Sequence, residues 1–99
     1  MRIVLKPHAF DHGFTAEQIY GALNDRNKRQ FPVARQNRAG ARYQNRENKF
    51  KVFAQDKPNG PYLHIVYEVF SDRIEVFHCR EMERREIDVY QGKKGDAKR

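Results

Sequence analysis

One histidine and the arginines that follow it are the residues best suited to chemistry on a phosphate. The ordinary pKa of an imidazole suits proton transfer near neutral pH, and the pattern around His78 predicts the end of a strand just before a helix. Side chains at such junctions often face a concave site. Guanidinium groups at Arg80 and Arg84 would stabilise the charge that develops on an attacked phosphate, and Arg85 adds a third cation. His78, Arg80 and Arg84 are therefore the candidate catalytic residues.

The same segment also has a simpler interpretation as an ordinary solvent-exposed helix. Three acids, Glu81, Glu83 and Glu86, lie among the arginines at spacings of three and four residues. Such pairs attract one another on a helix surface and offset the basic charge. Both interpretations remain open at the level of the sequence.

The positive charge of the chain is concentrated in one internal stretch, from Arg26 to Lys51. This stretch holds nine basic residues and one acid, Glu47, a net charge of +8, whereas the rest holds 11 basic and 12 acidic residues. A basic stretch in a near-neutral body is typical of a surface that binds a polyanion, nucleic acid first. The alternative is a solvated loop that maintains solubility. The candidate nucleic-acid-binding residues are Arg26, Lys28, Arg29, Arg35, Arg38, Arg42, Tyr43, Arg46, Lys49 and Lys51.

Other residues that often carry chemistry give weaker signals. His8 and His12 are four residues apart and would share a helical face, but a zinc site needs three or four ligands, and no Glu follows His8 as in zinc proteases. We therefore expect neither a metal nor a cofactor. His64 is expected to pack on a central strand, and Cys79 to be a small core residue.

Length and composition indicate one domain, residues 1–92, followed by a charged and disordered tail, 93–99. A single cysteine excludes an internal disulfide and fits a reducing compartment. No apolar run approaches the ~20 residues of a membrane span, and the first residues lack the apolar core of a signal peptide. We expect a cytoplasmic protein that does not contact membranes.

Hydrophobic periodicity and turn signals predict the elements that would position these side chains. Thr15 and Gln18 have the spacing of a capping box, so a helix should start at Ala16. Alternating residues around the Pro–Asn–Gly turn predict a meander of three antiparallel strands, in which Val76 and His78 share a face. The expected fold is α+β, with helices on one face of a three- to four-stranded antiparallel sheet. The expected elements are a strand at 3–5, a helix at 16–24, an edge strand at 31–33, a loop at 37–48, strands at 49–56, 62–70 and 73–79, and a helix from 80 to 91.

Both ends of the chain resemble BrnT-type toxins of bacterial toxin–antitoxin pairs. The strand Arg73–Arg80, the Glu83–Glu86 segment and Tyr90 are similar to the ending of those proteins. His12 to Thr15, followed by a short helix, is similar to the signature near their start. These motifs cover about half of the chain.

The resemblance implies a RelE-like ribonuclease fold. Such toxins cut RNA, are held inactive by an antitoxin protein, and bind promoter DNA only as the toxin–antitoxin complex. By this analogy Arg80, Arg84 and His78 would form the site, with the basic stretch gripping RNA. Two alternatives stay open: a non-catalytic nucleic-acid-binding or regulatory domain of the same fold, and an interaction domain that binds an acidic protein.

Overall fold

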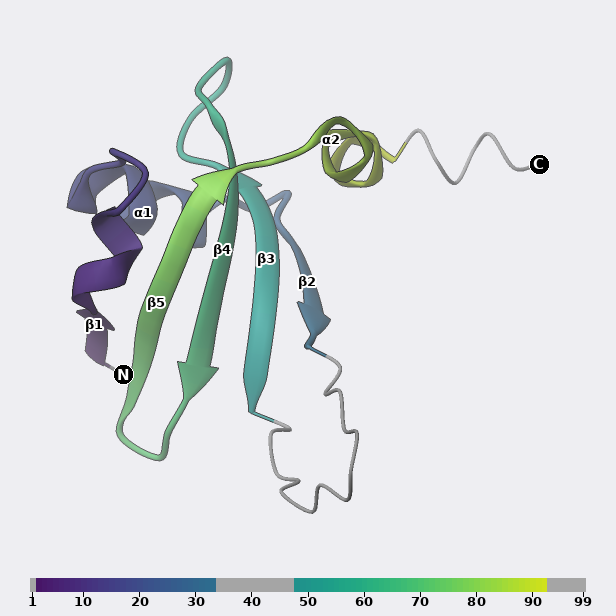
Figure 1. The fold of residues 1–99 in the computed structure, drawn as a ribbon. Helices are drawn as coiled ribbons and strands as arrows, with labels where there is room; N and C mark the ends of the chain where they lie inside the picture. Colours follow the sequence, from purple (N-terminus) through teal and green to yellow (C-terminus); the bar gives the residue numbers. More distant parts are fainter. Residues whose placement is uncertain (1, 34–47, 93–99) are drawn as a thin grey trace, which may run out of the picture.

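The part of the chain that the structure describes folds into one sheet with two α-helices and a short 3-10 helix (Figure 1). The computed structural model describes residues 2–33 and 48–92. The loop expected at 37–48 lies outside these residues up to position 47, as does the expected tail at 93–99. The elements are β1 (Arg2–Leu5), η1 (Pro7–Phe10), α1 (Ala16–Leu23), β2 (Arg29–Pro32), β3 (Lys49–Gln55), β4 (Tyr62–Val69), β5 (Arg73–Glu81) and α2 (Arg84–Gln91).

Among the described residues the sheet has five strands, in the order β1-β5-β4-β3-β2, so the α+β class is confirmed but the expected number of three or four strands is wrong. The meander β3-β4-β5 is antiparallel as predicted, and β2 pairs with β3 at the edge near the expected position. The expectation of a purely antiparallel sheet is wrong, because β1 runs parallel to β5, with Arg2 opposite Arg73 and Leu5 opposite Val76. A parallel pair requires a crossover connection, and the chain from η1 through β4 provides it.

One face of the sheet, which we call the core face, is closed by η1 and α1. Alternating residues of β3 and β4, Val52, Ala54, Leu63 and Ile65, are fully buried there. Helix α1 contributes Ile19 and Ala22 to this core, and η1 contributes Ala9. The period-2 pattern of these strands therefore marks the side of the sheet that holds the hydrophobic core.

Helix α1 starts where the sequence predicts. The Thr15 hydroxyl oxygen accepts from the backbone N–H of Gln18 at 3.1 Å, and the Gln18 side-chain oxygen accepts from the backbone N–H of Thr15 at 2.9 Å. The predicted capping box is thus confirmed. It satisfies two N–H groups that the first helical turn leaves without intrahelical partners.

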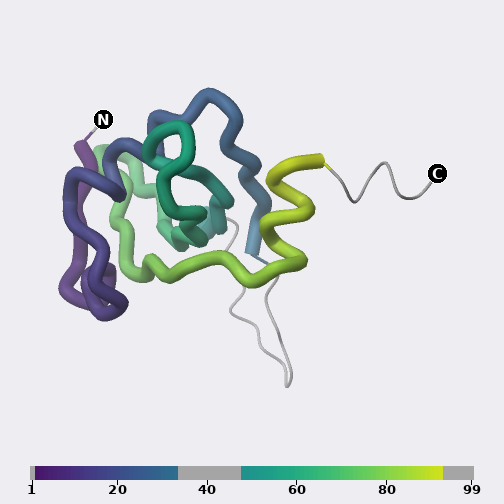
Figure 2. Tube along the Cα trace, turned by 90° about the horizontal axis from the view of Figure 1, so that it is seen from above, coloured from purple at the N-terminus to yellow at the C-terminus, as the bar shows by residue number. Residues whose placement is uncertain are grey.

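Helix α2 begins later than predicted and lies on the other face. The expectation that the helix starts at Arg80 is wrong, because β5 continues to pair with β4 as far as Glu81, opposite Leu63. The expectation that both helices cover one face is wrong too: α2 packs across the β2–β3 end of the opposite face, where Val89 lies beside Phe53. Figure 2 shows α2 on the far side of the molecule from the N-terminal helical elements. Gly92, with φ of 79°, ends the helix.

A β-bulge in β5 changes the face on which its last residues lie. Tyr67 is opposite Val76, but the preceding residue Val66 is opposite His78, so Phe77 is an extra residue in the strand. The prediction that Val76 and His78 share a face is therefore wrong. Val76 is buried in the core, whereas His78 lies on the opposite face. A sequence period of two does not reveal an inserted residue.

Within 2–33 and 48–92, neither α-helix is long and apolar enough to cross a membrane.

Candidate active site

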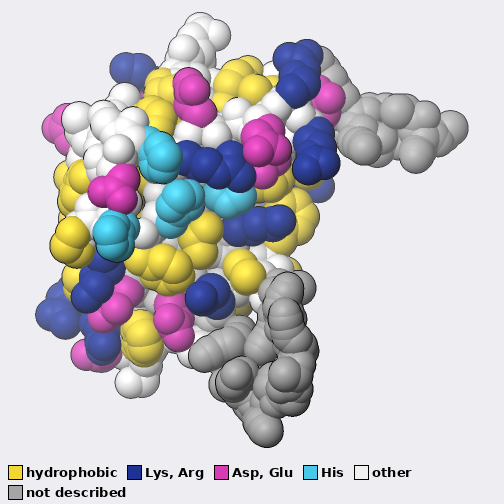
Figure 3. All heavy atoms as spheres, in the orientation of Figure 1, with side chains coloured by type: hydrophobic (Ala, Val, Ile, Leu, Met, Phe, Trp, Pro, Cys, Tyr) yellow, Lys and Arg dark blue, Asp and Glu magenta, His cyan; other side chains and the backbone are white. Residues whose placement is uncertain are grey.

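The face opposite the core, which we call the open face, carries most of the chemistry-bearing side chains. Strand alternation places Lys51 and Phe53 of β3, His64 of β4, and His78 and Arg80 of β5 on this side. Figure 3 shows histidine, cationic and acidic side chains lying together on one face of the molecule. The sheet thus presents a polar surface where its other side presents a hydrophobic core.

Arg80 is held by a two-pronged ion pair with Glu86 of α2. Its Nη1 donates to Glu86 Oε1 at 3.0 Å and its Nη2 donates to Glu86 Oε2 at 3.0 Å. Nη1 also donates to the carbonyl oxygen of Glu81 at 2.8 Å. The Arg80 side chain is 28% exposed and that of Glu86 14%. Parallel bonds of this kind fix both groups, so the pair joins the end of β5 to α2.

His64 completes this arrangement from the neighbouring strand. Its Nδ1 lies 3.0 Å from Arg80 Nη2 and 3.1 Å from Glu86 Oε2. A single ring nitrogen either accepts the Arg80 hydrogen or donates to Glu86, so the tautomer decides which bond forms. Burial lowers the pKa of His64 and the Arg80 charge lowers it further, although Glu86 opposes the change. His64 is therefore uncharged at neutral pH.

Glu86 is ionised over the whole physiological range. Burial alone would raise the pKa of its carboxyl group, but the hydrogen bonds from Arg80 and from the backbone N–H of Glu83 lower it to about 2. The carboxylate thus neutralises the Arg80 charge. This contact makes Arg80 first of all a structural link between β5 and α2.

Three imidazoles follow one another across the open face, and we call them the histidine row: His12, His78 and His64. The ring centroids of His12 and His78 are 5.5 Å apart in an edge-on arrangement, and those of His78 and His64 are 6.3 Å apart. Burial lowers the pKa of His78, and the nearby His12 and Arg80 lower it further. A half-buried His78 with a lowered pKa is suited to accept a proton, and the exposed His12 lies beside it.

The structure separates the three predicted catalytic residues. His78 and Arg80 lie on the same strand and the same face. Arg84 lies on α2 with a side chain that is 75% exposed, and its Nε is 3.6 Å from Asp88 Oδ1 one turn along. The partners that the sequence interpretation missed are His64, Glu86 and His12.

The predicted nucleic-acid-binding residues divide between several places. On the open face, Lys49 lies 5.0 Å from the centre of the Phe77 ring, and Lys51 lies 5.8 Å from that of Phe53. Arg29 donates to the carbonyl oxygen of Val89 at 3.0 Å, which ties β2 to α2. Two members are exposed in the connection from α1 to β2, Arg26 and Lys28. Five members lie outside the described residues: Arg35, Arg38, Arg42, Tyr43 and Arg46.

In the described part of the chain, no group of three or more His, Cys, Asp and Glu side chains is arranged to hold a metal ion. The Nδ1 of His8 instead lies 2.9 Å from Asp11 Oδ2. No protein-family model matches the sequence, and a search of curated proteins finds no match. The functional conclusion therefore rests on the geometry of this face.

Proposed function

We propose that this protein is a metal-independent endoribonuclease that binds RNA across the open face, and that it is the toxin of a bacterial toxin–antitoxin pair in the cytoplasm. The observation that carries the proposal is the pair of imidazoles, His12 and His78, whose ring centroids lie 5.5 Å apart edge-on, on a surface that also carries Lys49 and Lys51. An uncharged histidine in contact with a second, exposed one supplies a base and an acid to a phosphate that lies against both rings.

The cleavage step needs only these groups and the RNA. His78 takes the proton of a ribose 2′-hydroxyl, and the 2′-oxygen forms a bond to the adjacent phosphorus. The bond from phosphorus to the 5′-oxygen breaks, and His12 gives that oxygen a proton. The products are a 2′,3′-cyclic phosphate and a 5′-hydroxyl. Lysine ammonium groups neutralise the phosphates on either side.

Arg80 has a positioning role in this mechanism. Its two-pronged ion pair with Glu86 fixes the end of β5, and its charge helps to keep His78 uncharged. Direct stabilisation of the attacked phosphate by Arg80 and Arg84 stays a prediction from the sequence. An antitoxin would be a small acidic protein that covers this basic surface.

A second candidate function is RNA binding without cleavage. The observation that favours it is the neutralisation of Arg80 by Glu86, which reduces the charge available to a transition state. Binding of an acidic protein partner would use the same cations. Both alternatives predict that His12 and His78 contribute no chemistry.

The test is incubation of purified protein with RNA in the presence of EDTA, followed by analysis of the product ends. We expect 2′,3′-cyclic phosphate and 5′-hydroxyl ends from the wild type and from His8→Asn, and intact RNA from His78→Asn and His12→Asn. His8 is the matched control because it is an exposed histidine paired with Asp11. Intact RNA with the wild-type protein, together with tight salt-dependent binding, would establish the binding domain instead. Growth arrest on expression, relieved by His78→Asn, tests the toxin role.

A further inference from the structure

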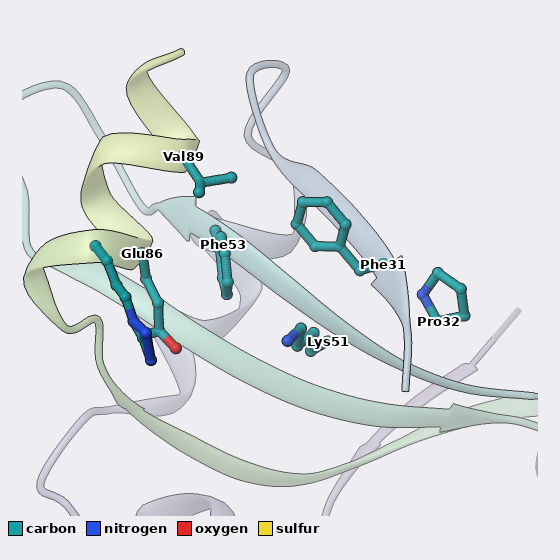
Figure 4. A pocket seen from close by; sticks show the side chains of 7 residues that line it. Phe31, Pro32, Lys51, Phe53, Glu86 and Val89 are labelled. Carbon is teal, nitrogen blue, oxygen red and sulfur yellow. The ribbon is translucent and has the colours of Figure 1, made fainter. Parts of the chain in front are cut away.

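A cavity lies on the open face where α2 crosses the β2–β3 end of the sheet. Its volume is about 400 Å³, within the range of small-molecule sites. Figure 4 shows Phe31, Phe53 and Val89 turned toward one another around this space, with Lys51 on the same side. The lining residues are Phe31, Pro32, Lys51, Phe53, Arg85, Glu86 and Val89.

Two aromatic rings form the apolar walls of the cavity. The ring centroids of Phe31 and Phe53 are 5.3 Å apart, with Phe53 buried and Phe31 half-buried. Aromatic faces of this kind are what proteins use to stack single-stranded bases. Val89 closes the third side with an aliphatic surface.

The polar groups of the cavity donate hydrogen bonds. Lys51 and Arg85 carry only donors, and both line the space. Among the described residues that line the cavity, Glu86 is the one acceptor side chain, but its oxygens already accept from Arg80 and from the backbone N–H of Glu83. A base that presents two adjacent acceptors therefore fits this set of groups. Guanine presents O6 and N7 side by side, and Arg or Lys is the usual partner for that pair.

We propose that this cavity binds a guanine base of the RNA, next to the phosphate that is cleaved. The inference rests on the proposed function, because it places the cavity on the path of the same strand. Ring contacts lead from the cavity to the histidine row: Phe53 to His64 at 5.4 Å, then His64 to His78 at 6.3 Å. Cleavage should accordingly prefer sites beside guanosine.

The test is titration calorimetry of the full chain with the four ribonucleoside 3′-monophosphates. Guanosine monophosphate should bind most tightly. Phe31→Ala should weaken its binding roughly five- to a hundredfold, the usual contribution of one base–aromatic stack. Lys51→Gln should remove most of the preference for guanosine over adenosine. Lys57→Gln is the matched control, because Lys57 is an exposed lysine in the turn after β3, outside the cavity.

The outcomes separate this inference from the proposed function. Equal affinity for the four nucleotides, or an equal loss in Lys51→Gln and Lys57→Gln, overturns the guanine site. If RNA is cleaved without preference for any base, the ribonuclease proposal stands and the guanine site is wrong. If guanosine monophosphate binds as expected and RNA stays intact, the site stands and the cleavage proposal is wrong. Circular dichroism of each variant confirms that it is folded.

Discussion

The two faces of the same three strands differ in almost every property. On the core face, Leu63 and Ile65 of β4 are fully buried under α1 and η1. On the open face, the residue between them, His64, is buried in contact with polar groups, Arg80 of β5 and Glu86 of α2. Adjacent residues of one strand thus serve two different purposes. The core face supplies most of the stability through apolar burial, and the open face supplies the chemistry through polar contacts.

Truncation of the core face should have the largest effect on stability. Leu63→Ala removes fully buried methyl groups and should lower the free energy of unfolding by about 2–5 kcal/mol. Val66→Ala, in the same strand but half-buried on the open face, should lower it by roughly 1 kcal/mol. Urea unfolding followed by circular dichroism measures both. Equal losses would show that the open face contributes as much apolar burial as the core face.

Much of this division was predictable from local patterns. The alternation in 49–56 and 62–70 correctly identified β3 and β4, and the Thr15–Gln18 spacing correctly placed the start of α1. These signals depend on neighbours within a few residues. The pairing of β1 with β5 depends on residues far apart in the chain, and no local pattern encodes it.

The site was harder to predict because it depends on the bulge. In the register set by Val69 opposite Ile74, an unbroken ladder would place Cys79 opposite His64. The extra residue at Phe77 places Arg80 there instead, on the open face and within reach of Glu86. The sequence identified His78 and Arg80 as chemically interesting, but not the insertion that brings His64 and Glu86 to them.

Removal of the Glu86 charge should have the second largest effect. Glu86→Gln leaves Arg80 without its carboxylate and should lower the free energy of unfolding by roughly 1.5–3 kcal/mol. Hydrogen exchange should increase most in α2, which loses its anchor to β5. Glu81→Gln, an exposed neighbour, is the control and should change stability little. A loss of the same size in both variants would contradict a stabilising role for the Arg80–Glu86 ion pair.

Acid should destabilise the open face in two stages. The pKa values of His64 and His78 are lowered in the folded protein, so the unfolded chain binds more protons as the pH falls below their ordinary 6.5, and stability decreases. Glu86, with a pKa of about 2 against an ordinary 4.5, adds a second loss between those values. Denaturant unfolding from pH 8 to pH 3 measures both losses of stability. Glu86→Gln should abolish the second loss, which comes from protonation of the Glu86 carboxylate. A stability that rises below pH 6.5 would contradict the neutral state of the two histidines.

Replacement of His78 should have the smallest effect on stability. His78→Asn changes a half-buried side chain without a hydrogen-bond partner among the described residues, so the free energy of unfolding should shift by no more than about 0.5 kcal/mol. RNA cleavage should nevertheless be lost. A large loss of stability would place His78 with the structural residues of the open face. His12 would then be the member of the catalytic pair that serves chemistry without contributing to stability.

The pairing of β1 with β5 also has a consequence for biosynthesis. Arg2 to Leu5 are synthesised well before their partners, Arg73 to Val76. The backbone groups of β1 that pair with β5 therefore stay without these partners until β5 has left the ribosome. Sheets that join distant segments fold slowly, and open strand edges promote aggregation meanwhile. The nascent chain should consequently reach its native sheet only after translation has passed β5.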